Sequence, residues 1–281
     1  MKYAIVGGDM RSVLLAESLS ADGHTVHCFA NEKGKVHRAV RCSCLVSCLY
    51  GADCVVLPVP AERGGILNAP LSTEKKPTEE IITCLVPGQM LFGGVISDKL
   101  NSAAADAGVR VFDFMKDESF VLYNAALTAE AAAGLMIHDC DRAVLGSRAL
   151  ILGYGRLGKE LSRILSALGC EVTVAARGAV AVSVGMHTIN ITELENGIDG
   201  FDFIINTVPA RILSSSALCT ASEGAFLMEL ASAPGGFDAE LAQNIGLKTV
   251  SAPGLPGRFS PRSSAQYIKE YIYTAVNAGK E

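Results

Sequence analysis

The chain has 281 residues, 49% hydrophobic and 19% charged, which is typical of a globular protein long enough for two cores and excludes a disordered segment. Its net charge of −5 at pH 7 argues against nucleic-acid binding, which needs a basic face. No apolar run reaches the roughly 20 residues that span a bilayer, and a strand begins at once without a signal peptide, so we expect a cytoplasmic protein without a membrane segment.

Short apolar strands alternate with helical patterns over residues 1–126, as in a mostly parallel, doubly wound sheet. The predicted strands are Lys2–Val6, Thr25–Phe29, Cys54–Leu57, Ile81–Leu85, Leu91–Val95 and Val109–Phe112, and the predicted helices are Arg11–Leu19 and Asp98–Ala107. We expect a Rossmann-like N-terminal domain here that binds the substrate.

A glycine turn, Gly7-Gly-Asp-Met-Arg11, follows the first strand but lacks the full dinucleotide spacing. The start of the next helix suits an anion, with Arg11 assisting. Alternatively, the glycines serve only the turn of a degenerate nucleotide fold.

The nine cysteines include a cluster of Cys42, Cys44 and Cys48. No Cys-x-x-Cys pair occurs, and His37 completes no familiar zinc spacing. We therefore expect reduced, structural cysteines and no metal site, with zinc or iron ligation as the alternative.

The same alternation resumes over residues 127–281, after an alanine-rich helix, Thr128–His138, that links the domains. The predicted strands are Ala149–Leu152, Val172–Ala175, Phe203–Asn206, Phe226–Leu230 and Lys248–Val250, and a helix from Ser263 to Val276 closes the chain. The sequence thus predicts an α/β protein of two doubly wound, Rossmann-like domains with a cleft between them, the second domain being the cofactor domain.

The cofactor prediction rests on Gly153-Tyr154-Gly155-Arg156-Leu157-Gly158, a Gly-x-Gly-x-x-Gly turn between a strand and an amphipathic helix. Gly153 allows the tight turn, Gly155 lets the backbone approach a pyrophosphate, and Gly158 lets the helix pack on the strand. The N–H groups at the helix start would face that anion.

The end of the next strand, Ala176-Arg177-Gly178, selects the cofactor. Sites that prefer NAD place Asp or Glu there for the ribose hydroxyls, whereas a guanidinium binds a 2′-phosphate. We therefore predict NADP. The alternative is that Arg177 is an ordinary surface charge.

Loops at three later strand ends combine Pro and Gly: Thr207-Val208-Pro209, Ala231-Ser232 to Gly236, and Ala252 to Gly257. Close approach of rigid backbone suits a cofactor site, so Thr207, Val208, Pro209, Ala231 and Ser232 are predicted cofactor contacts. Alternatively, each of these loops considered alone is an ordinary turn.

Together these residues resemble the A subunits of dipicolinate synthase from spore-forming bacteria. The motifs that carry the resemblance are Gly7-Gly-Asp-x-Arg11, Tyr123-Asn-Ala-x-x-Thr128-x-Glu130, Gly153 to Arg177, Leu230-Ala-Ser-x-Pro-Gly-Gly236, and Ala252-Pro-Gly-Leu-Pro-Gly257 with Pro261. Leu127 departs from the pattern, which has Pro before Thr128.

The resemblance implies a fold related to the D-2-hydroxyacid dehydrogenases. It implies an NADP-linked oxidation of dihydrodipicolinate to dipicolinate during sporulation, in partnership with a second, flavoprotein-like subunit. The hydroxylated precursor of dihydrodipicolinate is an alternative substrate.

For such a dicarboxylate we expect Arg11, Arg258 and Arg262 to bind the carboxylates. The candidate catalytic residues, near the domain junction and at a strand end, are Asn124, Thr128, Glu130 and Ser232. Glu130 is the candidate proton acceptor, with a helix cap as the alternative.

Two other functions remain open. One is an NADP-dependent reductase of a 2-keto or 2-hydroxy acid, although no histidine follows His187 to serve it. The other is a non-catalytic NADP-binding subunit that stabilises a partner. The alanine-rich helices of the second domain would also suit a homo-oligomer.

Overall fold

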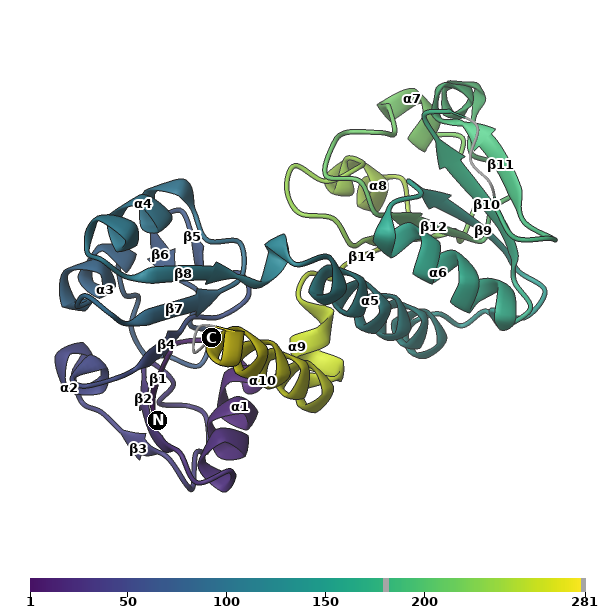
Figure 1. Ribbon diagram of the computed structural model, residues 1–281. Coiled ribbons are helices and arrows are strands. Elements are labelled where there is room, and N and C mark those ends of the chain that lie inside the picture. The colour runs from purple at the N-terminus through teal and green to yellow at the C-terminus, as the bar shows by residue number, and fades with distance from the viewer. Residues whose placement is uncertain (179–181, 279–281) are drawn as a thin grey trace. The chain divides into compact units, whose positions relative to one another are not determined.

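The computed structural model describes residues 1–178 and 182–278, which form two compact units (Figure 1). Unit 1 comprises Met1–Val121 with Gly257–Glu281, and unit 2 comprises Leu122–Pro256. Each unit contains its own six-stranded sheet. The predicted α/β fold with two Rossmann-like sheets is confirmed.

Unit 1 is built on a parallel sheet with strand order β3-β2-β1-β4-β7-β8. Its strands are β1 (Lys2–Val6), β2 (Thr25–Phe29), β3 (Val40–Arg41), β4 (Cys54–Val56), β7 (Met90–Gly93) and β8 (Arg110–Asp113). Its first helices are α1 (Met10–Ala21), α2 (Leu45–Leu49), α3 (Thr78–Cys84) and α4 (Asp98–Asp106), and a small hairpin pairs β5 (Glu62–Arg63) with β6 (Ile66–Leu67). This order reverses direction between β1 and β4, as in doubly wound nucleotide-binding folds.

The predicted strand Ile81–Leu85 is wrong, because these residues belong to helix α3 and its C-terminal end. Ile81 is buried in the core of unit 1, and two acids, Glu79 and Glu80, occupy the first helical turn, where they favour a helix. A short apolar run does not distinguish a strand from a buried helix by its pattern alone.

Unit 2 repeats the architecture, with the all-parallel order β11-β10-β9-β12-β13-β14. Its strands are β9 (Arg148–Leu152), β10 (Glu171–Ala176), β11 (His187–Asn190), β12 (Phe203–Asn206), β13 (Phe226–Glu229) and β14 (Lys248–Ser251). The other elements are α6 (Arg156–Ala167), α7 (Ser215–Leu218), α8 (Ala239–Asn244) and the 3₁₀ helix Ile191–Asn196. The four central strands are buried on both faces, as their continuous apolar runs indicate.

The C-terminal helix departs from the expected domain boundaries, since residues 257–278 belong to unit 1 and do not complete the second domain. After α9 (Leu255–Phe259), α10 (Pro261–Ala278) lies along α1 (Figure 1). Ile268, Ile272 and Val276 are buried in the same core as Leu15 of α1. Burial of this apolar stripe explains why the chain crosses back.

Helix α5 (Glu118–Asp139) is longer than predicted and runs through Leu127 without a turn. Among the residues that the structure describes, it is the one helix that is long and apolar enough by composition to cross a membrane, although Glu130 interrupts its apolar sequence. Half of its apolar window is nevertheless buried, with Ala129, Ala132 and Met136 packed in the core of unit 2. These contacts are those of a core helix.

Most of the cysteines contribute to the two cores. Burial raises the pKa of the thiols of Cys28 and Cys170 to about 11 and that of Cys54 to about 12, which keeps them protonated and unreactive at neutral pH. Cys42 contacts His27 (Sγ to Nδ1, 3.5 Å). The described residues contain no group of three or more side chains placed to hold a metal ion.

Replacing Ile272 with alanine should weaken unit 1 selectively, because a fully buried side chain of α10 is truncated there. We expect a loss of about 2–4 kcal/mol. Hydrogen exchange should accelerate in α1 and β1 and stay unchanged in β9, and the exposed Val46→Ala serves as the control. Unchanged exchange in α1, or acceleration in β9 instead, would show that α10 does not stabilise unit 1.

Candidate functional site

The turn between β9 and α6 has the shape that its three glycines predict. Gly153 has a φ of +96°, and a Cβ there would lie 2.5 Å from Val208 and 2.8 Å from the Thr207 hydroxyl. A Cβ on Gly158 would lie 2.2 Å from the carbonyl oxygen of Gly153. Both positions therefore exclude every other residue, which explains the first and third glycines of the motif.

Gly155 differs, because a Cβ at this position would meet nothing within 4 Å. It is the N-cap of α6 and supplies no side-chain acceptor for the first N–H groups of that helix. No acidic residue lies in the first turn either. Open space in front of a helix N-terminus without an acid is what a pyrophosphate requires, so these residues fit a dinucleotide.

The end of β10 lies beside this turn, because Gly153 N donates to the Ala175 carbonyl at 2.9 Å. Ala176 is buried, whereas Arg177 and Gly178 are exposed. Within the described part of unit 2, Arg177 forms no ion pair. Its guanidinium is accessible at the position where dinucleotide folds meet the adenosine ribose.

The end of β12 also meets the turn. Thr207 follows β12 and donates from both its N–H (3.0 Å) and its hydroxyl (2.8 Å) to the Leu152 carbonyl. The contacts around Gly153 and Gly158 bring Thr207 and Val208 against the glycine turn. The predicted grouping of the glycines with these two residues is therefore present in the structure, while Pro209 is exposed at the loop edge.

Two polar residues at this edge, Asn206 and Glu229, were not predicted as site residues from the sequence. They are register partners at the last positions of β12 and β13, and Asn206 is fully buried. Asn206 Nδ2 donates to Glu229 Oε1 at 2.7 Å. The available signal was a polar residue ending each of two adjacent apolar strands, where a buried strand end needs a partner.

The expected catalytic residues lie on separate elements. Thr128 donates its hydroxyl to the Asn124 carbonyl at 2.6 Å, a local bond within α5. Glu130 is exposed in the middle of α5, so it is not a helix cap. Ser232 is exposed in the loop after β13, next to the half-buried Ala231. Apart from the Thr128–Asn124 bond, the contacts of the described residues do not join these side chains.

The three expected carboxylate-binding arginines all belong to unit 1. Arg11 is buried, and its Nη2 donates to Asp9 at 2.8 Å and to the Val59 carbonyl at 2.6 Å. Asp9 also accepts from the Arg11 N–H at the start of α1, so a carboxylate of the protein already occupies the anion position expected there. Arg258 and Arg262 are exposed.

A hollow of about 320 Å³ lies at the carboxyl ends of β13 and β14, lined by Glu229, Pro234, Phe237 and Ser251 among others. This volume suits a small ligand. It shares a sheet edge with the glycine turn, because all strands of unit 2 run parallel.

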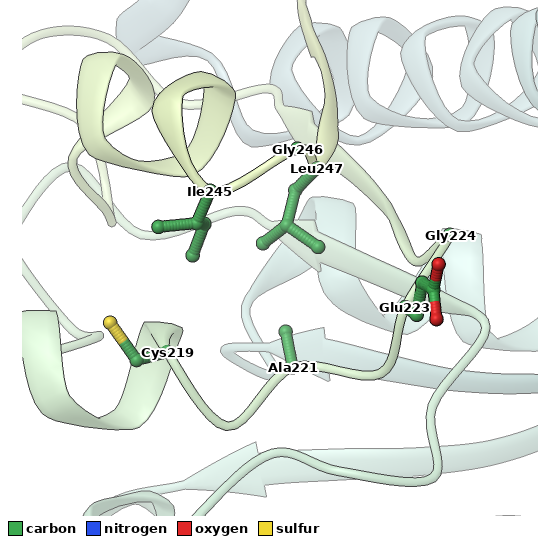
Figure 2. Close-up of a pocket in the computed structure, with 7 residues that line it drawn as sticks. All are labelled: Cys219, Ala221, Glu223, Gly224, Ile245, Gly246 and Leu247. Atoms are coloured by element: carbon green, nitrogen blue, oxygen red, sulfur yellow. The ribbon is translucent and has the colours of Figure 1, made fainter.

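A second hollow of about 290 Å³ lies at the opposite edge of the sheet (Figure 2). Its lining includes Cys219, Glu223, Ile245 and Leu247, from the segments that precede β13 and β14. The amino ends of parallel strands are not where Rossmann folds bind cofactors. We therefore assign the candidate site to the edge with the glycine turn.

Two family models match this chain. Residues 2–115 match the family model that describes the N-terminal domain of the dipicolinate synthase A subunit. Residues 121–234 match the D-isomer specific 2-hydroxyacid dehydrogenase, NAD binding domain. The second match supports an oxidoreductase that uses a nicotinamide dinucleotide.

Individual relatives cover almost the whole chain. The A subunit of Bacillus subtilis dipicolinate synthase is 29% identical, over 97% of this chain and 94% of the relative. The crystal structure of a B. subtilis dipicolinate synthase A chain is 26% identical, with a TM-score of 0.81 and coverage of 100% and 98% of the two chains. The predicted resemblance to the A subunits of dipicolinate synthase is thus confirmed.

The fold extends to a more distant enzyme. The apo structure of Escherichia coli D-lactate dehydrogenase has a TM-score of 0.64 at 14% identity and covers 99% of this chain and 98% of its own. The fold is therefore related to that of D-2-hydroxyacid dehydrogenases, as the resemblance implied.

Two alanine substitutions should separate the roles of the glycines. Gly158→Ala should distort the turn and lower the stability of unit 2 by about 1–3 kcal/mol, because its Cβ meets the Gly153 carbonyl. Gly155→Ala should keep normal stability, since its φ is −76° and the space is open, but should weaken dinucleotide binding. Thermal unfolding and calorimetric titration measure both effects. Unchanged dinucleotide binding by Gly155→Ala would place the pyrophosphate elsewhere.

Proposed function

We propose that the chain is the NADP-dependent oxidoreductase component of a dipicolinate synthase and oxidises dihydrodipicolinate to dipicolinate. The observation that carries this proposal is the likeness to the A subunit of B. subtilis dipicolinate synthase along nearly the whole chain. A glycine turn shaped for a dinucleotide supports it.

The reaction places modest demands on the protein. The dihydropyridine ring loses a hydride and a proton, and the product ring is aromatic, so the substrate supplies most of the driving force. A bound nicotinamide would supply the hydride acceptor. The residues of the chain must hold the substrate and cofactor in reacting geometry and bind two carboxylates, for which no strong base is needed.

NADP is proposed over NAD because of the end of β10. The exposed Arg177 follows the buried Ala176 directly, and Ala176, Arg177 and Gly178 contain no carboxylate to repel a 2′-phosphate. A guanidinium binds a phosphate through two parallel hydrogen bonds. Gly178 leaves space for the phosphate, since a Cβ there would meet nothing within 4 Å.

Arg258 and Arg262 are the proposed carboxylate ligands, because both are exposed and lie on neighbouring helices of unit 1. Arg11 would contribute mainly through Asp9, which it holds against Gly257: a Cβ on Gly257 would lie 2.3 Å from Asp9 Oδ2. Glu130 remains the proposed proton acceptor. Asn124, Thr128 and Ser232 are proposed as polar contacts to the reactants.

The relatives are named as one component of a larger enzyme, and we propose a second, flavoprotein-like partner and a cytoplasmic role in sporulation. The chain would form no complex with nucleic acid or membrane. Homo-oligomerisation is a further proposal, tested by light scattering of the purified chain.

A 2-hydroxy acid reductase is disfavoured by the histidines of unit 2. His138 pairs with Asp139 (Nδ1 to Oδ1, 2.6 Å), but Lys248 at the start of β14 contacts the Asp139 carbonyl. This pair therefore lies at the amino edge of the sheet. His187 begins β11 at the same edge. A histidine–carboxylate pair beside the nicotinamide is what such reductases use, and neither residue supplies it.

The proposal is tested with purified chain, NADP⁺ and freshly generated dihydrodipicolinate, following NADPH and dipicolinate by ultraviolet absorbance. Parallel reactions contain NAD⁺, the hydroxylated precursor, or the partner protein. Formation of both products by this chain alone supports the proposal. Tight NADPH binding without turnover until the partner is added would instead favour a non-catalytic, cofactor-binding role.

Substitution of Arg177 by alanine should weaken NADPH binding by about tenfold to a hundredfold and leave NADH binding unchanged, because only the 2′-phosphate is lost as a partner. Calorimetric titration measures both affinities, with the exposed Arg163→Ala as the matched control. An equal loss of affinity for NADPH and NADH would mean that Arg177 does not bind the 2′-phosphate.

Alanine at Arg258 or Arg262 should raise KM for dihydrodipicolinate by about tenfold per lost ion pair and leave the Kd for NADPH unchanged. Steady-state kinetics measures the effect, and Arg38→Ala, an exposed arginine of unit 1, is the control. Normal KM in both variants would remove these arginines from the site.

A further inference from the structure

Asn206 and Glu229 are joined by a hydrogen bond, and their side-chain polar atoms are also bonded to the neighbouring loops. Asn206 Nδ2 donates to Glu229 Oε1 (2.7 Å) and to the Val208 carbonyl (2.8 Å), and Asn206 Oδ1 accepts from the Val208 N–H (3.1 Å). Asn206 is fully buried, so its side chain depends on these partners for its hydrogen bonds.

The Glu229 carboxylate also bonds to the loop that follows β13. Its Oε1 accepts from the Ala231 N–H (2.8 Å), and its Oε2 accepts from the Gly236 N–H (2.7 Å). One carboxylate therefore joins both ends of the loop between residues 231 and 236. Hydrogen bonds to a charged acceptor are roughly twice as strong as those between neutral groups.

Two glycines let that loop close over the pair. A Cβ on Gly236 would lie 2.3 Å from Asn206 Cγ, and a Cβ on Gly235 would lie 3.0 Å from Glu229 Oε2. The Gly236 carbonyl in turn accepts from the N–H groups of Ile212 and Leu213, both at 2.8 Å. The loops after β12 and β13 are thus tied to one another through the pair.

These hydrogen bonds leave few backbone N–H groups of the two loops free to bind a ligand. The N–H groups of Thr207, Val208 and Ala231 are already used, by Leu152, Asn206 and Glu229 respectively. A ligand at these loops is therefore held by their shape and remaining carbonyl and hydroxyl groups. The shape, in turn, depends on the pair.

We propose that Asn206 and Glu229 are positioning residues that hold both loops in the conformation that receives the nicotinamide half of the dinucleotide. This inference rests on the proposed function, since it assumes that a dinucleotide occupies this edge. The adenosine half lies towards the glycine turn and Arg177, on the other side of β9 from these loops in the strand order, and does not depend on the pair.

The test compares two probes on Glu229→Gln: NADPH, which spans both halves of the site, and adenosine 2′,5′-bisphosphate, which fills only the adenosine half. Glutamine has the same shape but offers one acceptor oxygen in place of two. We expect NADPH binding to weaken about tenfold while bisphosphate binding stays unchanged. Glu195→Gln, the same change on an exposed residue of unit 2, is the matched control.

A pair of exchange variants tests the bond between the two side chains. Asn206→Asp alone sets two carboxylates against each other and removes the donor to the Val208 carbonyl. Adding Glu229→Gln removes the charge repulsion and returns a donor beside residue 206, although the bond to the Val208 carbonyl stays lost. The double variant should bind NADPH more tightly than Asn206→Asp alone. Urea unfolding of each variant establishes that it is folded.

The outcomes separate the two proposals. Equal weakening of both probes by Glu229→Gln, or no weakening of either, overturns the positioning role while the wild-type chain still binds NADPH. A double variant that binds NADPH no more tightly than Asn206→Asp alone, despite the removal of the charge repulsion, also overturns it. Failure of the wild-type chain to bind either probe overturns the proposed function itself.

Discussion

The close approach of Gly158 to the Gly153 carbonyl is the constraint on which the cofactor domain depends. It sets how α6 leaves β9, and therefore where the helix N-terminus points. Thr207 bonds to the Leu152 carbonyl at the end of β9, next to the same turn. This bond holds the end of β12 beside β9, where the strand order reverses. A crevice at that reversal is a consequence of the topology, and the first N–H groups of α6 face it.

Buried parallel strands impose a second constraint at the same edge. The strand ends carry backbone groups and side chains that cannot reach water, so each needs a partner inside the protein. Asn206 and Glu229 provide these partners for two loops at once. The bonds that complete the core of unit 2 therefore also shape the surface beside the glycine turn.

Much of this architecture follows from the sequence. Apolar runs predict the strands of both sheets apart from β3 and β11, which are short, largely exposed edge strands without such a run. The glycine turn and its contacts with Thr207 and Val208 follow from Gly153 and Gly158, which no other residue can replace. Ile81–Leu85 was mistaken for a strand because a short apolar run has no distinctive period. The position of α10 was missed because an apolar stripe such as Ile268, Ile272 and Val276 predicts burial but does not specify in which core, which only tertiary packing decides. The Asn206–Glu229 pair joins residues 23 positions apart, so it emerges only when β12 and β13 are placed in register. Arg11 was expected to bind substrate because of its charge. In the structure it pairs with Asp9, and this pairing depends on the local turn, which the charge alone does not reveal.

The most direct test of the account is a crystal structure of the chain with NADP⁺ bound. The account predicts the pyrophosphate at the N–H groups at the start of α6, beside Gly155. It places the 2′-phosphate against Arg177 and the nicotinamide beside the Thr207–Pro209 and Ala231–Gly236 loops. A cofactor bound at the Gly7–Arg11 turn of unit 1, or one whose 2′-phosphate faces away from Arg177, would contradict it.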